Sequence, residues 1–235
     1  MAEPDGPPEP LDSLGFVDAV AGLPEQLAAA HEAAGELDAS QLPDADEIDN
    51  IVVLGMGGSG VAGDVLAAVT DPVLSVPVTV RKQYHLPGFV GPRTLAFAVS
   101  YSGDTEETAE AAACARERGA RVTVVSNGGA LAELAEEWGV LHVACPAGYM
   151  PRAALGALIA PLFVALYRMG LAPEAHAWLV KAQEQLARRR DRCRPGVAAP
   201  TNPAREIARR IGGTIPLVYG GACWARSPRC AGKPT

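Results

Sequence analysis

Two short segments of this sequence combine glycines with hydroxyl side chains in a way that could bind an anion. Residues 55–60 read GMGGSG, and residues 100–105 read SYSGDT. Each segment follows an apolar run and precedes an alanine-rich one, so each is predicted to join the end of a strand to the start of a helix. Backbone N–H groups at the start of a helix have no partner within the helix, and they bind anions there. We therefore expect an anion to bind at these two segments.

The first segment alone is compatible with a dinucleotide. Gly55, Gly57 and Gly60 fit the G-x-G-x-x-G pattern of NAD and NADP sites. Such a site also needs an acidic residue after the second strand to bind the ribose, or a basic residue to bind a 2′-phosphate. Arg81 and Lys82 stand at that place, so this alternative predicts NADP and not NAD.

The second segment favours a monophosphate. It places Ser100, Ser102 and Thr105 within six residues, and such hydroxyls donate to phosphate oxygens while the helix dipole balances the charge. A dinucleotide fold has no use for this cluster. The alternative interpretation is that Ser102 or Asp104 only caps the helix that follows.

Together with Ser126 and Asn127 at the end of the next predicted strand, the two segments resemble the SIS (sugar isomerase) domain, whose serine-rich loops bind phosphosugars. Three stretches narrow the resemblance to the bifunctional phosphoglucose/phosphomannose isomerases: residues 56–64 (MGGSGVAGD), 100–108 (SYSGDTEET) and 151–155 (PRAAL). The resemblance extends from about Asp12 to about Gly221. It includes residues 202–208 (NPAREIA), which are similar to the start of the helix leading into the family's second SIS domain.

The resemblance implies an aldose–ketose isomerase that interconverts glucose 6-phosphate or mannose 6-phosphate with fructose 6-phosphate through a cis-enediolate, without a metal or a cofactor. It implies contacts to the substrate and its phosphate from Gly58, Ser59, Ser100, Ser102 and Thr105. It also implies that Arg152 supplies positive charge near the reacting carbons, because a preorganised guanidinium stabilises an enediolate. The helix dipole otherwise disfavours an arginine just inside a helix start.

The sequence lacks the acid and the base that this reaction needs. In the family these are a glutamate in an Asn-Glu-Asn type segment and a histidine in a Pro-Glu-x-x-His-Asn segment, and neither segment occurs here. Glu106 and Glu107 suit the first turn of a helix, and His85 and His142 are expected to be packed or surface side chains. The resemblance therefore predicts an isomerase that is impaired in this chain. The alternatives are a non-catalytic phosphosugar-binding or regulatory module and, less favoured, an NADP-binding domain.

The end of the chain departs from the family. Family-like sequence stops at Gly220 and Gly221, and residues 222–235 are a mixture rich in Arg, Cys, Pro and Ser. A shifted reading frame in a GC-rich gene produces such a mixture. We therefore expect a frameshift or a premature end after about Gly221.

The two segments require a particular set of secondary-structure elements. From Asn50 onward, short apolar runs alternate with alanine-rich stretches, which predicts an α/β fold with a five-stranded parallel sheet flanked by helices. The expected strands are residues 51–54, 76–80, 95–99, 121–125 and 140–144, and the expected helices are 61–68, 106–118, 130–138, 151–169 and 174–190. An amphipathic helix ahead of them, residues 14–30, is expected to be interrupted at Pro24.

This pattern divides the chain into five parts. They are a disordered leader (1–11), an N-terminal helix and acidic loop (12–48), a first SIS domain (49–170), linking helices with the start of an incomplete second SIS domain (171–221), and the non-family tail (222–235). A helix starting near Asn202 and a short strand at residues 216–219 belong to the incomplete domain.

Composition excludes several classes of partner. A net charge of −7 with 5% aromatic residues argues against a nucleic-acid partner. One basic cluster is present and is predicted to lie at the C-terminal end of a helix; it consists of Arg188, Arg189, Arg190, Arg192 and Arg194. No run approaches the ~20 apolar residues of a membrane span. The five cysteines form no C-x-x-C pair and no secretory signal precedes them, so a reduced, cytoplasmic protein is expected. The expected partners are a phosphorylated sugar and, in the full-length form, a second copy, since the family's sites lie at a dimer interface.

Overall fold

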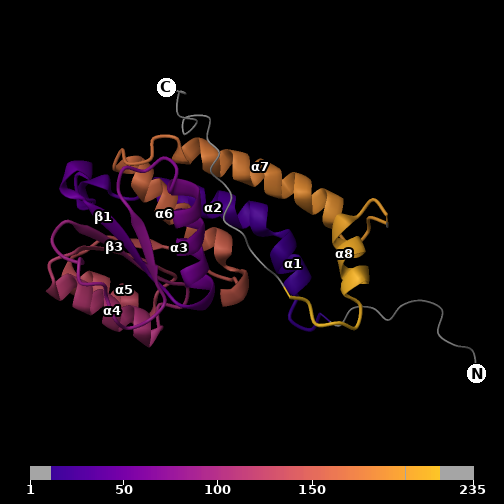
Figure 1. Cartoon of the computed structure of the whole chain (residues 1–235), viewed down its shortest axis with the longest axis horizontal. Helices are drawn as coiled ribbons and strands as arrows, with labels where there is room; N and C mark the ends of the chain where they lie inside the picture. The colour runs from indigo at the N-terminus through magenta and orange to yellow at the C-terminus, as the bar shows by residue number, and fades with distance from the viewer. Residues whose placement is uncertain (1–11, 199, 218–235) are drawn as a thin grey trace, which may run out of the picture.

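A five-stranded parallel sheet forms the centre of the molecule in the computed structural model, which describes residues 12–198 and 200–217 (Figure 1). Its strands are β1 (Asn50–Leu54), β2 (Val78–Arg81), β3 (Thr94–Ser100), β4 (Arg121–Ser126) and β5 (His142–Ala144). Their spatial order is β2-β1-β3-β4-β5, and every neighbouring pair is parallel. The predicted α/β fold class is confirmed.

Two strands begin two residues later than predicted. Pro77 precedes β2 and has no N–H to give to a ladder, although its carbonyl accepts from the N–H of Ile51 at 2.9 Å. Val140 precedes β5, and its N–H donates to the carbonyl of Ala135 at 3.0 Å, which closes the preceding helix. The missing N–H of Pro77 and the helix-closing bond of Val140 therefore set the two starting points, which apolar patterning cannot resolve.

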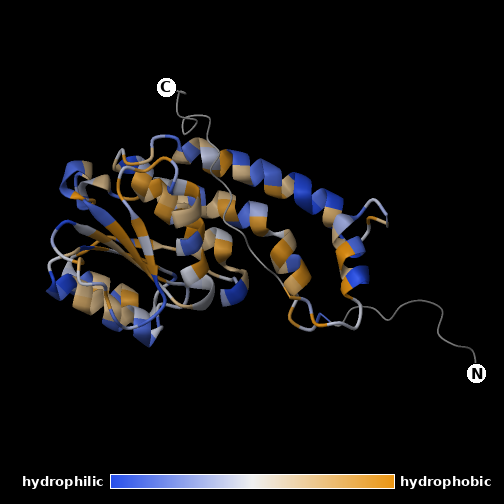
Figure 2. Ribbon diagram, viewed as in Figure 1, coloured by the Kyte–Doolittle hydropathy of each residue, from blue (hydrophilic) through white to orange (hydrophobic). Residues whose placement is uncertain are grey.

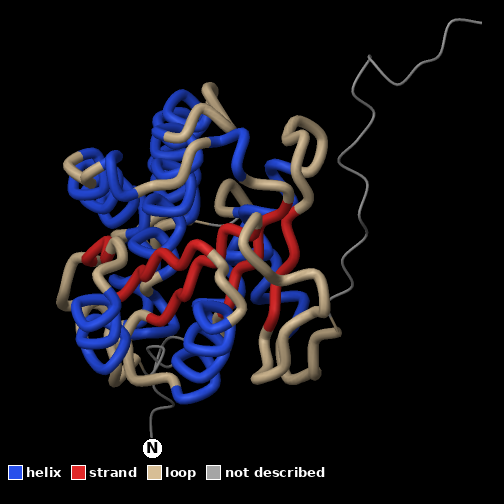
Figure 3. The backbone as a smooth tube through the Cα atoms, turned by 90° about the vertical axis from the view of Figure 1, so that its left-hand side faces the viewer, coloured by secondary structure: helices blue, strands red, loops and turns tan. Residues whose placement is uncertain are grey.

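Helices cover both faces of the sheet, as the edge-on view shows (Figure 3). Alternate strand residues point to opposite faces, so Ile51 and Val53 pack with α2 (Leu23–Gly35), α3 (Gly57–Thr70) and α6 (Leu155–Arg168). Val52 and Leu54 pack instead with α4 (Glu106–Glu117) and α5 (Gly129–Trp138). Helix α3, which follows β1, therefore lies on one face of the sheet, and α4, which follows β3, lies on the other.

Three further helices are α1 (Phe16–Ala21), α7 (Ala175–Cys193) and α8 (Pro203–Ile211), of which α7 adds Ala175 and Leu179 to the core on the α2 and α6 side of the sheet. Helix α7 packs on α2 and α6, and its outward side is mostly polar (Figure 2). The predicted basic cluster falls at its C-terminal end, where Arg190 pairs with Glu25 at 2.6 Å. No helix in the described ranges is both long and apolar enough to cross a membrane.

The main differences from the predicted helix boundaries lie near Gly22, at the start of α3 and at the start of α6. The N-terminal helix divides at Gly22, and Pro24 lies in the first turn of α2, where a proline costs no hydrogen bond. Helix α3 begins at Gly57, four residues earlier than expected. The expected helix 151–169 begins as a short 3₁₀ helix, η3 (Pro151–Ala153), and only then becomes α6.

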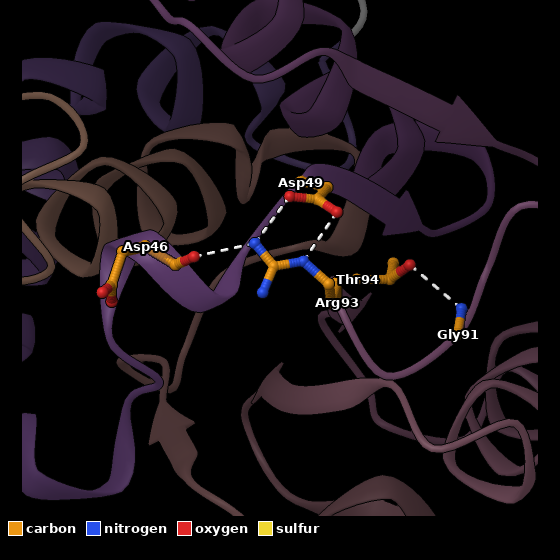
Figure 4. Close-up of polar contacts among 5 residues, drawn as sticks. All are labelled: Asp46, Asp49, Gly91, Arg93 and Thr94. Carbon is orange, nitrogen blue, oxygen red and sulfur yellow. Dashed lines mark hydrogen bonds and ion pairs between the residues drawn. The ribbon is translucent and has the colours of Figure 1, made fainter.

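An arginine fixes the amino-terminal edge of the sheet. Arg93, which precedes β3, donates from Nε and from a terminal nitrogen to the two carboxylate oxygens of Asp49, at 2.7 Å each (Figure 4). It also donates to the carbonyl of Asp46 at 2.8 Å. Hydrogen bonding from Arg93 lowers the pKa of Asp49. The acidic loop before β1 is thereby held at the edge opposite the ends of the strands that carry the candidate site.

Three predictions fall wholly or mostly on residues that the structure does not describe. These are the leader (1–11), the tail (222–235) and the strand expected at 216–219, of which only the first two residues are described, without strand structure.

Candidate functional site

The two hydroxyl and glycine segments lie side by side at the carboxyl edge of the sheet. Residues 55–60 follow β1 and residues 100–105 follow β3, and these strands are neighbours with Leu54 opposite Ala98. The chain goes from β1 outward to the edge strand β2 and then returns across to β3, so the two following helices lie on opposite faces. Open α/β sheets bind ligands at such a reversal of strand order. The tertiary structure thus places both segments where a ligand can contact them together.

The first segment is shaped by close backbone approaches that only glycine allows. A Cβ on Gly55 would lie 2.9 Å from the carbonyl oxygen of Val99, and a Cβ on Gly60 would lie 2.6 Å from the carbonyl oxygen of Gly55. Met56 is the N-cap of α3, and its side chain makes no capping bond. The first-turn N–H groups of α3, from Gly57 to Ser59, are therefore available to an anion.

The second segment holds its own hydroxyls in place. Ser100 Oγ lies 2.8 Å from Thr105 Oγ1, and the N–H of Gly103 donates to Ser100 Oγ at 3.2 Å. Ser100 is buried, whereas Ser102 is exposed and accepts from the N–H of Asp104 at 3.3 Å. Thr105 is the N-cap of α4 without a side-chain capping bond. Ser102 thus presents a hydroxyl to solvent beside a second uncapped helix start.

The capping alternative raised from the sequence is wrong for α4. Asp104 Oδ1 accepts from the N–H of Ala130 at 3.0 Å, so this carboxylate caps α5 and not the helix that follows it in sequence. The N–H of Leu131 donates to the carbonyl of Gly103 at 3.0 Å and makes a second link between the same loops. The loop after β4 therefore supports the second segment from the side.

Tyr101 joins the first segment to the second and to the loop before η3. Its N–H donates to Ser59 Oγ at 3.3 Å, and its hydroxyl donates to the carbonyl of Pro146 at 3.1 Å. The N–H of Tyr149 donates to the same hydroxyl at 2.9 Å. Burial raises the pKa of Tyr101 above its usual value. Sequence reasoning missed this tyrosine, since its partners lie more than 40 residues away.

Arg152 lies beside the first segment. A Cβ on Gly58 would lie 3.3 Å from the carbonyl oxygen of Pro151 and 4.0 Å from the Cα of Arg152, so η3 packs directly against the start of α3. The Arg152 side chain is exposed, and within the described ranges it forms no ion pair. The structure therefore brings together the six residues assigned to the site, with Gly58, Ser59 and Arg152 on one side and Ser100, Ser102 and Thr105 on the other.

Two of the other candidate side chains, those of His142 and Lys82, bond elsewhere. His142 Nε2 lies 2.9 Å from Ser126 Oγ, consistent with a packed histidine. Lys82, which an NADP site would need for a 2′-phosphate, forms an ion pair with Asp64, and its side-chain stem lies over Gly60. Within residues 12–198 and 200–217, no group of three His, Cys, Asp or Glu side chains could hold a metal ion.

The chain is similar in sequence to known proteins. The SIS domain family matches residues 44–148. The chain is 34% identical over 203 residues to a bifunctional phosphoglucose/phosphomannose isomerase of Caldicellulosiruptor bescii, a match that covers 86% of this chain and 59% of that protein. It is 28% identical over 179 residues to a D-glucosamine-6-phosphate 4-epimerase of Sulfolobus acidocaldarius, covering 76% of this chain and 54% of that protein.

A solved structure shows the same fold. The C-terminal domain of a glucosamine-fructose-6-phosphate aminotransferase from Francisella tularensis aligns with a TM-score of 0.57 at 18% identity, over 82% of this chain and 57% of that one. The present chain thus spans less than two thirds of the length of each of these relatives.

Proposed function

Residues 44–148 belong to the SIS domain family, and from this premise we propose that the paired loops bind a hexose 6-phosphate. The phosphate is held by the second segment and the start of α4, and the sugar lies towards the first segment and Arg152. Both similar proteins named above carry a phosphorylated hexose or hexosamine in their names, which supports this class of ligand.

The observation that carries the proposal is the pairing of two uncapped helix starts. Met56 and Thr105, the N-caps of α3 and α4, make no side-chain capping bond. Both helices begin at adjacent strand ends, so their positive ends lie at the same edge of the sheet. A dianionic phosphate gains from two such ends and from the exposed hydroxyl of Ser102, whereas a single capped helix offers neither.

The reaction that fits this geometry is aldose–ketose isomerisation. Moving a proton between C1 and C2 of the open-chain sugar passes through a cis-enediolate that carries negative charge. The exposed guanidinium of Arg152, beside Gly58, stabilises that charge as it develops. Turnover also requires a base at the carbon and an acid for ring opening.

A non-catalytic phosphosugar-binding module is the second candidate. It is favoured because two polar side chains that could take part in proton transfer bond other groups of the protein. His142 bonds Ser126, and Asp104 caps α5. In this case Arg152 contributes affinity for the sugar and no rate.

Calorimetry tests the binding proposal. The whole chain is titrated with fructose 6-phosphate, glucose 6-phosphate and mannose 6-phosphate, and with inorganic phosphate and NADPH as comparisons. The proposal expects saturable binding of at least one hexose 6-phosphate, weaker binding of phosphate and none of NADPH. Binding of NADPH without binding of any hexose phosphate would contradict it.

A coupled assay then separates the two candidates. Mannose 6-phosphate is supplied, and fructose 6-phosphate is detected through added coupling enzymes. Turnover that is lost in Arg152→Ala supports the isomerase, whereas binding without turnover supports the module.

A further inference from the structure

A buried glutamine from the N-terminal helix pair holds the segment that carries Arg152. Gln26 lies in α2 and is only 1% exposed. Its Nε2 donates to the carbonyl of Ala153 at 2.8 Å, and its Oε1 accepts from the N–H groups of Gly156 at 2.6 Å and Ala157 at 3.2 Å. One amide thus makes three hydrogen bonds to a segment about 130 residues away in sequence.

These bonds replace a cap that α6 lacks. Ala154 is the N-cap of α6 and has no side chain that can accept a hydrogen bond. The first N–H groups of a helix need partners, and a buried one left without a partner is costly. Gln26 supplies the acceptor from another helix, and its N–H₂ group simultaneously holds the carbonyl at the end of η3. The junction between η3 and α6 is therefore clamped on both sides.

Gly156 is required for this clamp. A Cβ at this position would lie 2.9 Å from Gln26 Oε1 and 3.0 Å from the N–H nitrogen of Leu27. Only glycine lets α2 approach the first turn of α6 so closely. Gln26 can therefore reach the start of α6 only because residue 156 is a glycine.

The clamp acts one residue from Arg152. Ala153, whose carbonyl Gln26 holds, directly follows Arg152, and the backbone of Arg152 packs against Gly58 on its other side. The first segment and Gln26 therefore fix the backbone of η3 from opposite directions. The Arg152 side chain stays exposed, so its position depends on how firmly that backbone is held.

We propose that Gln26 is a positioning residue that sets where the Arg152 guanidinium lies relative to the bound sugar. Gln26 is buried behind η3 and acts only through that segment. The proposal rests on the proposed function, because it assumes that Arg152 faces the sugar. Gln26 should therefore affect the recognition of charge at the reacting carbons more than the recognition of the phosphate.

The test uses two ligands of the whole chain. The affinity for fructose 6-phosphate depends on contacts to its phosphate and sugar. A phosphorylated aldonohydroxamate is an anionic mimic of the enediolate, and its affinity depends in addition on the guanidinium of Arg152. The dissociation constant of fructose 6-phosphate divided by that of the hydroxamate gives a ratio that measures the contribution of Arg152. Gln26→Glu keeps an acceptor for Gly156 and Ala157 but replaces the donor to Ala153 with an oxygen. It is expected to lower the ratio about tenfold with a smaller change for fructose 6-phosphate.

A double-mutant cycle shows whether the effect passes through Arg152. Arg152→Ala should remove the preference for the hydroxamate, and adding Gln26→Glu should then lower it no further. Gln183→Glu, a half-buried glutamine of α7 that bonds His31, is the matched control and should leave the ratio unchanged. Should Gln26→Glu fail to fold, Gln26→Asn serves instead, since its shorter amide cannot reach both sides of the junction.

The outcomes are distinguishable. An unchanged ratio in a folded Gln26 variant, or an equal loss with and without Arg152, would overturn the positioning role while leaving the proposed function intact. Failure of the unaltered chain to bind either ligand would overturn the proposed function and this inference with it.

Discussion

The side chain of Ser59 accepts a hydrogen bond from the backbone N–H of Tyr101 at 3.3 Å, and this contact joins the loop after β1 to the loop after β3. The two residues are 42 positions apart in sequence. Because the tyrosine hydroxyl also bridges Pro146 and Tyr149, one residue connects three segments of the candidate site. The site is therefore held by a small set of long-range hydrogen bonds to the backbone.

Replacing Tyr101 with phenylalanine tests this connection. The change leaves the ring and removes the hydroxyl, so the carbonyl of Pro146 and the N–H of Tyr149 lose their partner. We expect the free energy of unfolding to fall by about 1–3 kcal/mol, and hexose phosphate binding to weaken. Urea denaturation and calorimetry measure the two effects. Tyr84→Phe, at a tyrosine that is 39% exposed, is the control and should change neither; equal behaviour of the two variants would contradict the bridging role.

Ser102→Ala tests the second segment as the phosphate site. Ser102 is exposed, so the fold should tolerate the change, while binding of a hexose 6-phosphate weakens by about 1–3 kcal/mol through loss of a charge-assisted hydrogen bond. Ser75→Ala, an exposed serine in the turn before β2, should bind normally. Calorimetric affinity that is unchanged in Ser102→Ala would place the phosphate elsewhere.

A pair of glycine substitutions tests how closely the loops after β3 and β4 pack. Gly103 has a φ of +80°, and a Cβ there would lie 1.8 Å from the carbonyl oxygen of Gly128. Gly103→Ala is expected to cost at least about 2 kcal/mol of unfolding free energy and to abolish binding. At Gly35, the last residue of α2, an added Cβ would meet nothing within 4 Å, and Gly35→Ala should be neutral or stabilise by up to about 1 kcal/mol. Thermal and urea unfolding compare them, and a tolerant Gly103 would contradict the observed packing.

Two buried threonines in helices offer a matched comparison of hydroxyl groups. Thr108 in α4 is 1% exposed, and within the described ranges its Oγ1 has no hydrogen-bond partner. Thr70 in α3 is 0% exposed, and its Oγ1 donates to the carbonyl of Leu66 at 2.8 Å. Thr108→Val should keep or raise the unfolding free energy by about 1 kcal/mol, whereas Thr70→Val should lower it by about 1 kcal/mol. The reverse order of the two variants in urea denaturation would refute this expectation.

A histidine pair between α2 and α7 predicts how stability depends on pH. His31 Nε2 lies 3.1 Å from His176 Nδ1, and Gln183 contacts the other nitrogen of His31 at 3.2 Å. These three side chains line a cavity of about 400 Å³, and the charged residues Glu32 and Arg168 line it as well. Burial lowers the pKa of His31 from 6.5, and the charge of His176 lowers it further.

The sign of the effect follows from proton uptake. Between the lowered pKa of folded His31 and about 6.5, the unfolded chain binds more protons than the folded one. The unfolding free energy should therefore fall as the pH drops below about 6.5, and this contribution should level off below the folded pKa. Urea denaturation from pH 8 to 5 measures it, and His31→Gln should show a shallower loss over the same range. An identical pH dependence in this variant would exclude His31 as the source.

The sequence by itself determined the fold class and the order of the elements, and it supplied the prediction of the site residues. Apolar runs of four or five residues between alanine-rich stretches predict a parallel sheet with helices, and glycines and hydroxyls at strand ends predict where a ligand binds. These signals are local, because strand alternation, helix starts and tight turns depend on residues close in sequence. Their boundaries were less accurate where one residue decided them, as at Pro77, which has no N–H, and at Val140, which closes the preceding helix.

Only the tertiary structure decided how those residues are held. Tyr101, Asp104 and Gln26 each bond to backbone groups of distant segments, and a side chain that serves a distant backbone leaves no periodic trace in the sequence. For the same reason the alternative drawn from the sequence had Ser102 or Asp104 cap the helix that follows, whereas in the fold Asp104 caps α5. Residue types near strand ends therefore predict which class of ligand the site binds. The packing of distant segments determines where each of those residues lies.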